Sequence, residues 1–539
     1  MLDNIPILSL LIFSPLVGIL VLLFVRRENG RLLRIIGVAG TVLPLLLAIW
    51  LMSGFDYSAG RQLVEQSVWI HLPLPQEFVP AGISQYYLEL NYSLAVDGIS
   101  LTLVFMTALI SLMAALASIV HIKKRWKAFY IWFLLLETGM LGVFLSQDLF
   151  LFFVFFEVTL VPMFFLIGIW GYKDREKTAN KFLLYNGIGS ALMLIAFIIL
   201  ITTGGFMVRE AATAEGSLAL DYVYSGDIQT IMTNMTATDS LVKGAAFTTS
   251  PFHMTEGMLT FTFFLLLIAF GIKLPIFPFH TWMLKVHAEA PPSVVMIHSG
   301  ILLKIGAYGL IRFGMQFFPE QTVDYAWLIA LFGVINILYG AILAFVQSDF
   351  RLVLAYSSIS HMGIVLLGIA SLNTTGVGGA VFQLVSHGLI SALMFLLVGS
   401  YYERTETTML EKLGGLAKSM PFMSGILLTA GLALLGLPGL SGFISEFLAF
   451  VGLFDTMPVM TVLGVAGVLL AAVYVLRAVL SITYGPMNPR FAEVKDARLI
   501  EAIPMIVLVA FIILIGIYPA ILSETIMPAV SDILNGIGG

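Results

Sequence analysis

The 539-residue chain contains no cysteine and few charged residues. Without cysteine it cannot form disulfides, Cys-ligated iron–sulfur clusters or thiolate zinc sites. Only 11% of its residues are charged, against about 25% in an average soluble chain, and 59% are hydrophobic. So few charges cannot cover a globular protein of this length, so the composition excludes a soluble enzyme and a disordered chain. The net charge of -5 and the lack of a basic patch give no sign of nucleic-acid binding.

Long apolar runs are what the chain has instead. A membrane-spanning helix needs ~20 mostly apolar residues, and the sequence predicts an all-α polytopic membrane protein with about 14 such helices. No basic n-region or small-residue cleavage site accompanies the first run, so we expect a retained helix and not a signal peptide. The predicted spans are 4–25, 33–53, 98–120, 127–146, 148–170, 178–203, 257–279, 288–313, 324–347, 350–371, 376–402, 422–452, 458–484 and 500–522.

Two connections between the predicted spans, about 54–92 and 205–256, are long and polar. Alternating residues within 60–92 predict a small β-hairpin there. Most of the 27 Lys and Arg residues fall in every second connection, and the intervening connections hold only Arg61, Arg209 and Lys243. Cytoplasmic loops carry the basic excess in membrane proteins. We therefore expect both termini on the outward side of the membrane.

A few ionisable residues lie inside the predicted spans. A lysine at mid-membrane costs about 2.5–3.5 kcal/mol on insertion scales, so its presence needs a reason. Arg312 and Arg477 lie near helix ends, where we expect them to extend to the membrane surface. The others have both signs at similar depth, which predicts a proton or ion path, although internal salt bridges that fix helix packing are the alternative. They are Glu137, Glu157, Lys273, His298, Lys304, His361, His387 and Glu446.

Other uses of the histidines were weighed. His361 and His387 could serve as axial haem ligands, and His280 and His287 share a helix face at a spacing that would suit a metal. Each is a single pair without further supporting residues. No Gly-rich nucleotide fingerprint follows a predicted strand. The chain therefore shows no means of carrying out redox chemistry alone.

Two predicted spans contain a Leu-Pro pair beside an ionisable residue. One is Lys273-Leu-Pro275 and the other is Leu437-Pro438, followed by Glu446. Proline removes a backbone N–H and breaks a helix, and broken helices in matching positions of two halves are typical of inverted-repeat transporters. The predicted division is 1–97 (helices 1–2 and an outward loop), 98–126 (helix 3), 127–314 (first repeat, helices 4–8), 315–485 (second repeat, helices 9–13) and 486–539 (helix 14 and tail).

These motifs resemble the antiporter-like subunit M (chain 4) family of proton-translocating NADH:quinone oxidoreductase, respiratory complex I. Its superfamily includes multi-subunit cation/proton antiporters. The matching segments are Val96-Asp-Gly-Ile-Ser100, Phe155-Phe-Glu157, Lys273-Leu-Pro-Ile-Phe-Pro-Phe-His-Thr-Trp282, His287-Ala-Glu-Ala-Pro291, Gly300-Ile-Leu-Leu-Lys304, Ala355-Tyr-Ser-Ser-Ile-Ser-His361, Ser386-His-Gly-Leu389 and Leu437-Pro-Gly-Leu-Ser-Gly-Phe-Ile-Ser-Glu446.

The resemblance implies a role for each buried residue. Glu157 and Lys273 would form the input pair, Lys304 the central relay and Glu446 the outlet group. His361 and His387, or waters, would connect Lys304 to Glu446. Glu137 and His298 would be secondary relays, and Glu137 could instead pair with a neighbouring subunit.

The resemblance also implies partners. No cofactor is expected in this chain; NADH or another donor, flavin, iron–sulfur clusters and quinone are expected on partner subunits. The expected partners are other membrane subunits, above all neighbouring antiporter-like subunits, together with the lipid bilayer and protons. Quinone reduction elsewhere in the complex would drive the transport.

Four positions depart from the family pattern, namely Lys285, His298, Leu352 and Glu406. They leave two alternatives open. The chain could belong to a multi-subunit Na+/H+ antiporter or a membrane-bound hydrogenase. It could also be a structural scaffold that binds quinone or haem.

Overall fold

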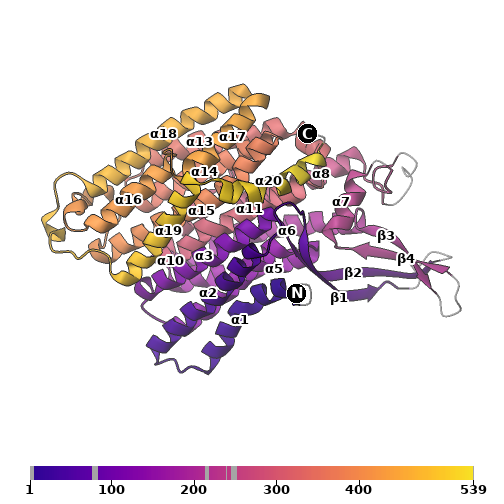
Figure 1. The fold of residues 1–539 in the computed structure, drawn as a ribbon, viewed down its shortest axis with the longest axis horizontal. Helices are drawn as coiled ribbons and strands as arrows, with labels where there is room; N and C mark the ends of the chain where they lie inside the picture. The colour runs from indigo at the N-terminus through magenta and orange to yellow at the C-terminus, as the bar shows by residue number, and fades with distance from the viewer. Residues whose placement is uncertain (1–4, 76–82, 213–217, 238, 245–251, 538–539) are drawn as a thin grey trace.

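In a computed structural model the chain forms a bundle of long helices, with a small β-sheet projecting from one end (Figure 1). Among the described residues, 13 helices are long and apolar enough to cross a membrane. Two shorter helices in series, α16 (Pro421–Leu434) and α17 (Ser441–Thr456), lie where one further span is predicted. Together with the 13 long helices they agree with the prediction of about 14 spans. The structure describes residues 5–75, 83–212, 218–237, 239–244 and 252–537.

The spanning helices begin and end within a few residues of the predicted limits, because the apolar runs that define them are long. They are α1 (Ile7–Phe24), α2 (Gly30–Ser53), α3 (Gly98–His121), α4 (Trp126–Leu145), α5 (Leu149–Trp170), α6 (Arg175–Thr202), α8 (Glu256–Lys273), Pro292–Met315, α13 (Ala326–Val346), α14 (Phe350–Ala370), α15 (Thr374–Thr405), α18 (Pro458–Thr483) and α19 (Leu499–Ile517). The shorter helices are α7 (Ile228–Thr236), α9 (Thr281–Glu289), α12 (Pro319–Asp324), α16 (Pro421–Leu434), α17 (Ser441–Thr456) and α20 (Ala520–Asn535).

The stretch Pro292–Met315 is one helix built from four parts. Two α-helical parts, α10 (Pro292–Ile297) and α11 (Leu303–Gly309), alternate with two π-helical segments, His298–Leu302 and Leu310–Met315. All of its spanning window is buried inside the bundle. This helix is therefore central and locally irregular, which is frequent at functional sites.

Both ends of the chain lie at the same end of the bundle as the sheet (Figure 1). We call this the sheet end. The opposite end carries the connections α1–α2, α3–α4 and α5–α6 with their Lys and Arg residues, and we call it the basic end. An even number of crossings places the two termini together, as predicted.

A four-stranded sheet adds to the helical fold. Strands β1 (Gln62–Pro73) and β2 (Ile83–Val96) pair antiparallel, which confirms the predicted hairpin. Strands β3 (Phe206–Ala212) and β4 (Leu218–Ser225) form a second hairpin that the sequence reading missed. The order is β1-β2-β4-β3, and β2 and β4 pair in parallel. The two long polar connections between the predicted spans thus contribute their strands to a single sheet.

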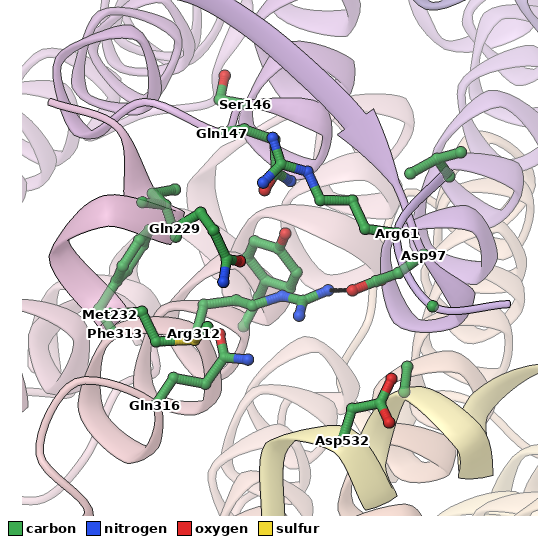
Figure 2. A pocket seen from close by; sticks show the side chains of 15 residues that line it. Arg61, Asp97, Ser146, Gln147, Gln229, Met232, Arg312, Phe313, Gln316 and Asp532 are labelled. Carbon is green, nitrogen blue, oxygen red and sulfur yellow. Dashed lines mark hydrogen bonds and ion pairs between the residues drawn. The ribbon is translucent and has the colours of Figure 1, made fainter. Parts of the chain in front are cut away.

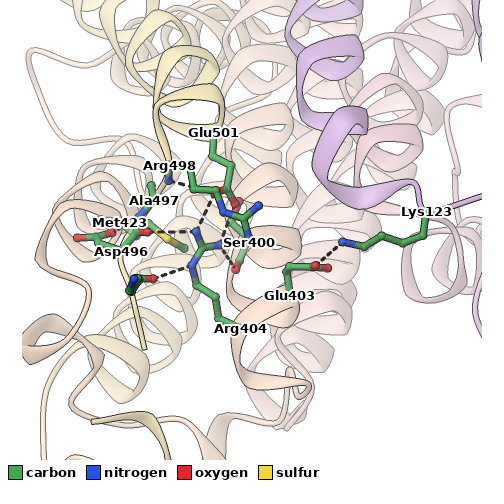
Figure 3. A network of polar contacts seen from close by, with 10 residues as sticks. Lys123, Ser400, Glu403, Arg404, Met423, Asp496, Ala497, Arg498 and Glu501 are labelled. Atoms are coloured by element: carbon green, nitrogen blue, oxygen red, sulfur yellow. Dashed lines mark hydrogen bonds and ion pairs between the residues drawn. The ribbon is translucent and has the colours of Figure 1, made fainter. Parts of the chain in front are cut away.

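An ion-pair network joins helices at the basic end (Figure 3). Arg404, in the last turn of α15, donates to both carboxylate oxygens of Glu501 on α19, at 2.8 and 2.7 Å. Arg404 also donates to the backbone oxygens of Lys495 and Asp496. The Glu501 side chain is only 1% exposed. Because both partners are buried and the contact is bidentate, the network fixes α15 against α19.

Candidate functional site

The first predicted helix break is present. Helix α8 ends at Lys273, and the chain resumes as α9 only after residues 274–280. Asn336 of α13 occupies this break. Its side-chain oxygen accepts the Phe277 N–H at 2.8 Å, and its amide nitrogen donates to the Pro275 oxygen at 3.4 Å. The opened backbone is therefore satisfied by protein, as buried irregular segments in membranes must be.

Lys273 lies at this break without a hydrogen-bond partner among the described residues. It is 2% exposed, and its Nζ is 4.8 Å from the ring centroid of Phe156. Glu157, on α5, also has one buried oxygen without a partner. Phe156 is the neighbour of Glu157 in α5, so Lys273 lies beside the helix that carries this acid, but the described residues form no ion pair between Lys273 and Glu157. The predicted input pair is thus close but not in contact.

The second predicted break is also present. Helix α16 ends at Leu434 and α17 begins at Ser441. Between them Gly436 and Gly439 have φ values of 76° and 92°, in the left-handed region that favours glycine. Glu446 reaches back from α17 to this break, where a Cβ on Gly436 would lie 2.7 Å from Glu446 Oε2. The glycine therefore makes room for the carboxylate.

A run of contacts connects Lys304 to Glu446. Lys304, in α11, is fully buried; its Nζ donates to the Ser299 oxygen and lies 2.9 Å from His387 Nδ1. The ring centroids of His387 and His361 are 5.2 Å apart. His361 Nε2 lies 3.5 Å from Glu446 Oε1. The structure thus brings four of the predicted residues together, on three different elements besides α11.

His361 faces hydrogen-bond acceptors on both sides of its ring. Its Nε2 lies 3.0 Å from the Leu434 oxygen, and its Nδ1 lies 2.8 Å from the Ser357 oxygen. A neutral imidazole has only one N–H, so both bonds form together only when the ring is protonated, with Glu446 as its counterion. Both ring nitrogens of His361 therefore lie within hydrogen-bond distance of a backbone oxygen.

A histidine pair lies between the two breaks. His298, the predicted secondary relay, places its Nδ1 2.9 Å from Nε2 of His287, and both side chains are buried. Apart from the family motif that contains it, the sequence indicated no role for His287 in the track. His280, weighed with His287 as a possible metal pair, has its Nε2 3.1 Å from the Tyr339 hydroxyl.

Three residues named in the sequence analysis lie apart from this track. Glu137, on α4, is completely buried, and neither oxygen has a partner among the described residues. Arg312 does not extend to the membrane surface as expected, because it forms an ion pair with Asp97 and its side chain is only 11% exposed. Arg477 lies on an exposed face of α18 and donates to the Phe345 oxygen.

The fold and the site define a polytopic membrane protein with two broken helices and a buried line of acids, lysines and histidines across the bundle. The family model described as "NADH:quinone oxidoreductase/Mrp antiporter, TM" matches residues 146–471, which is more than half of the chain. The chain belongs to this family. The matched residues include Glu157, Lys273, Lys304 and Glu446, and Glu137 lies outside them.

Relatives match nearly the full length. NAD(P)H-quinone oxidoreductase chain 4 1 of Synechococcus elongatus is 37% identical, covering 97% of this chain and 90% of its own. NADH-quinone oxidoreductase subunit M of Rhodobacter capsulatus is 34% identical, covering 98% and 96%. A chain in the solved structure of respiratory complex I from Thermus thermophilus with bound NADH is 27% identical, with a TM-score of 0.79, covering 99% and 100%.

Proposed function

We propose that the chain is a proton-translocating membrane subunit of an NADH:quinone oxidoreductase. Quinone reduction on other subunits drives protons through the buried track, so the chain acts as part of a translocase. The names of its relatives support the assignment to this complex. The observation that carries the transport role is the run of contacts from Lys304 through His387 and His361 to Glu446.

The first half of the track works as a charge-dependent switch. A carboxylate near a buried amine favours the ammonium form, and removing or neutralising that carboxylate favours the neutral amine. Because Glu157 and Lys273 are close but not bonded, a small movement of α5 or of the break at 274–280 changes their interaction. Loss of the Glu157 charge then releases the proton of Lys273 toward His298 and His287, which lie on the way to Lys304.

The second half works as a relay. Lys304 passes its proton to His387 Nδ1, and His387 passes a proton toward His361, directly or through water. The protonated His361 then delivers a proton to Glu446, the outlet group at the second break. Glu137 remains a secondary candidate, as a relay or as a contact with a neighbouring subunit.

The remaining parts of the reaction belong to partners. NADH or another donor, flavin, iron–sulfur clusters and quinone would be held by other subunits, and this cysteine-free chain offers no thiolate for a cluster. Neighbouring antiporter-like subunits would pack against its helices. We place the complex in a bacterial plasma membrane, with the sheet end and both termini outward. Segments 127–314 and 315–485 would be its two inverted repeats.

The family description also covers Mrp antiporters, so a Na+/H+ antiporter subunit is the second candidate. The departures at Lys285, His298 and Glu406 favour testing it. Sodium-dependent proton movement by the purified complex without NADH would support this alternative. Transport that needs NADH and quinone, and is indifferent to sodium, would support the first proposal.

Proton pumping by the assembled complex tests the proposal. Variants Glu157→Gln, Lys273→Ala and Glu446→Ala are each reconstituted in sealed vesicles, and acidification driven by NADH is followed with a fluorescent dye. Each should lower the protons moved per NADH oxidised. Glu524→Gln, at an exposed position of α20, is the control and should pump normally. Normal pumping by all three buried variants would overturn the proposal.

A further inference from the structure

A polar pocket of about 270 Å³ opens at the sheet end, apart from the track described above (Figure 2). It lies where α3, α4, α7, the stretch Pro292–Met315 and α20 come together. Its volume has room for several waters, and its polar lining can hold them. The polar residues used below are Arg61, Asp97, Gln147, Arg312, Gln316 and Asp532.

The ion pair between Asp97 and Arg312 crosses this pocket (Figure 2). Both side chains are mostly buried, at 17% and 11% exposure. Asp97 is also held by the first turn of α3, because its side chain accepts the N–H groups of Ile99 and Ser100. Arg61 points into the same pocket, and its Nε is buried without a partner among the described residues. The pocket is thus lined by charged side chains.

Arg312 lies on the same helix as the central relay. Lys304, Tyr308 and Arg312 are spaced four residues apart, which places them on one face of the helix over about 12 Å. A π-helical segment precedes Lys304, and another, Leu310–Met315, contains Arg312. Tyr308 therefore stands between the relay and the pocket.

Tyr308 lines the pocket and lies about one helical turn from Lys304. Its hydroxyl donates to the Phe144 oxygen at 3.1 Å, at the end of α4 beside the pocket. The guanidinium carbon of Arg312 lies 5.3 Å from the centroid of the Tyr308 ring. Tyr308 is 2% exposed and is the hydroxyl group on this helix face between Lys304 and Arg312.

We propose that this pocket is a second proton outlet, reached from Lys304 through Tyr308 and gated by the Asp97–Arg312 ion pair. A proton leaves the Lys304 ammonium and bonds to the Tyr308 oxygen, directly or through water, while the original Tyr308 O–H bond breaks. The released proton passes to water in the pocket. Lys304 becomes neutral, Tyr308 is regenerated, and no electron moves.

The ion pair controls this step electrostatically. While Arg312 spans the pocket, its positive charge opposes a second positive charge arriving from Lys304. Separation of Asp97 from Arg312 leaves an acceptor for that proton and opens a path for water. This inference rests on the proposed function, since it gives Lys304 a second direction of proton release besides His387.

Thiol labelling tests the outlet without measuring transport. Because the chain has no cysteine, Gln316→Cys and Tyr308→Cys each give this subunit its single thiol, and labelling is read on this subunit after the labelled complex has been separated into its subunits. Sealed vesicles of both orientations are treated with a membrane-impermeant methanethiosulfonate reagent. Gln316→Cys should be labelled from the sheet end. Tyr308→Cys should be labelled slowly, and severalfold faster when combined with Asp97→Asn.

Tyr130→Cys is the labelling control, because Tyr130 is equally buried on α4 and lies outside the pocket. Its rate should not change with Asp97→Asn. Equal labelling of Tyr308→Cys with and without Asp97→Asn, or labelling of Gln316→Cys from the basic end alone, would overturn the outlet.

Proton pumping then tests the role of the hydroxyl. Tyr308→Phe keeps the ring that packs edge-on against Phe144, 5.2 Å between centroids, and removes only the transferable proton. It should lower the protons moved per NADH without abolishing pumping, while quinone reduction in uncoupled membranes stays normal. Tyr130→Phe, which loses a hydroxyl bonded to Ser118 at 2.9 Å, is the matched control. Full pumping by Tyr308→Phe would overturn this role.

Failure of the proposed function can be distinguished from failure of the second outlet. If Glu157→Gln and Glu446→Ala also pump normally, the proposed function fails, while labelling still reports whether the pocket opens. If they fail to pump and Tyr308→Phe pumps normally, only the second outlet is wrong.

Discussion

The two helix breaks hold their charges in different ways. At the first break Lys273 is buried and the nearby Glu157 is half-buried, and among the described residues neither Lys273 Nζ nor Glu157 Oε1 has a hydrogen-bond partner. At the second break Glu446 contacts His361, whose ring is bonded to two backbone oxygens. One region keeps a lysine and an acid apart, and the other binds its groups into a network.

This difference suits the two breaks to different steps of proton transfer. An unpartnered buried charge is costly and responds strongly to its neighbours, which suits a switch. A bonded network holds donors and acceptors in place, which suits a relay.

The largest expected change in pumping and in melting temperature comes from replacing one residue at each helix break. His361→Phe should stop pumping and lower the melting temperature, because it leaves the Leu434 and Ser357 oxygens and Glu446 without their donor, at about 1–3 kcal/mol per group. Lys273→Met should also stop pumping but leave the melting temperature unchanged or raise it, because no bond is lost and a buried charge is removed. Thermal unfolding of the purified complex, with NADH-driven acidification alongside, measures both effects.

Lys285→Met, at an exposed position of α9, serves as the control for Lys273→Met and should change neither quantity. A marked loss of stability in Lys273→Met would show that Lys273 has a partner and that the two regions do not differ in this way.

A smaller effect is expected at the glycines of the second break. Gly436→Ala and Gly439→Ala should each cost about 1 kcal/mol of backbone strain, because both residues have positive φ. Only at Gly436 would the new Cβ meet Glu446, whereas nothing lies within 4 Å of a Cβ at Gly439. Pumping rates should therefore fall in Gly436→Ala and stay near normal in Gly439→Ala. Equal rates in the two variants would contradict the placement of Glu446.

A pH-dependent change in stability is expected at Asp148, which caps α5, the helix that carries Glu157. Burial raises the pKa of Asp148 from 3.8 to about 6. The folded protein therefore binds this proton more tightly than the unfolded chain, so stability falls as pH rises from about 4 to about 6 and is level above that. The change is at most about 3 kcal/mol.

The melting temperature measured across this pH range should show that slope in the wild type and lose it in Asp148→Asn. Asp174→Asn, at an exposed position at the basic end, should keep the slope. An unchanged slope in Asp148→Asn would assign the pH dependence to another group.

The sequence predicted the helices well because a membrane span is a local property. About 20 apolar residues are sufficient to define one, and Leu-Pro pairs at 274–275 and 437–438 were sufficient to place the breaks. The pairing of β2 with β4 could not be predicted in the same way. It joins segments more than a hundred residues apart, and alternation along one strand does not identify its neighbour.

The site was predicted in its residue types more fully than in its contacts. A buried Glu, Lys or His in an apolar span stands out in the sequence. Partners on other helices do not: nothing near Arg312 signals Asp97, and nothing near His298 signals His287. The His287-Ala-Glu-Ala-Pro291 motif was visible, but only the packing of α9 against the following helix gives it a function.

The parallel pairing of β2 with β4 has a consequence for how the protein is made. Strand β2 is synthesised before α3, and its neighbour β4 only after α6. The hairpin of β1 and β2 therefore has no neighbouring strand β4 to pair with until α3, α4, α5 and α6 have been inserted. The sheet closes only when those four have crossed in the correct order, so its formation marks the point in biogenesis at which the first six helices are correctly threaded.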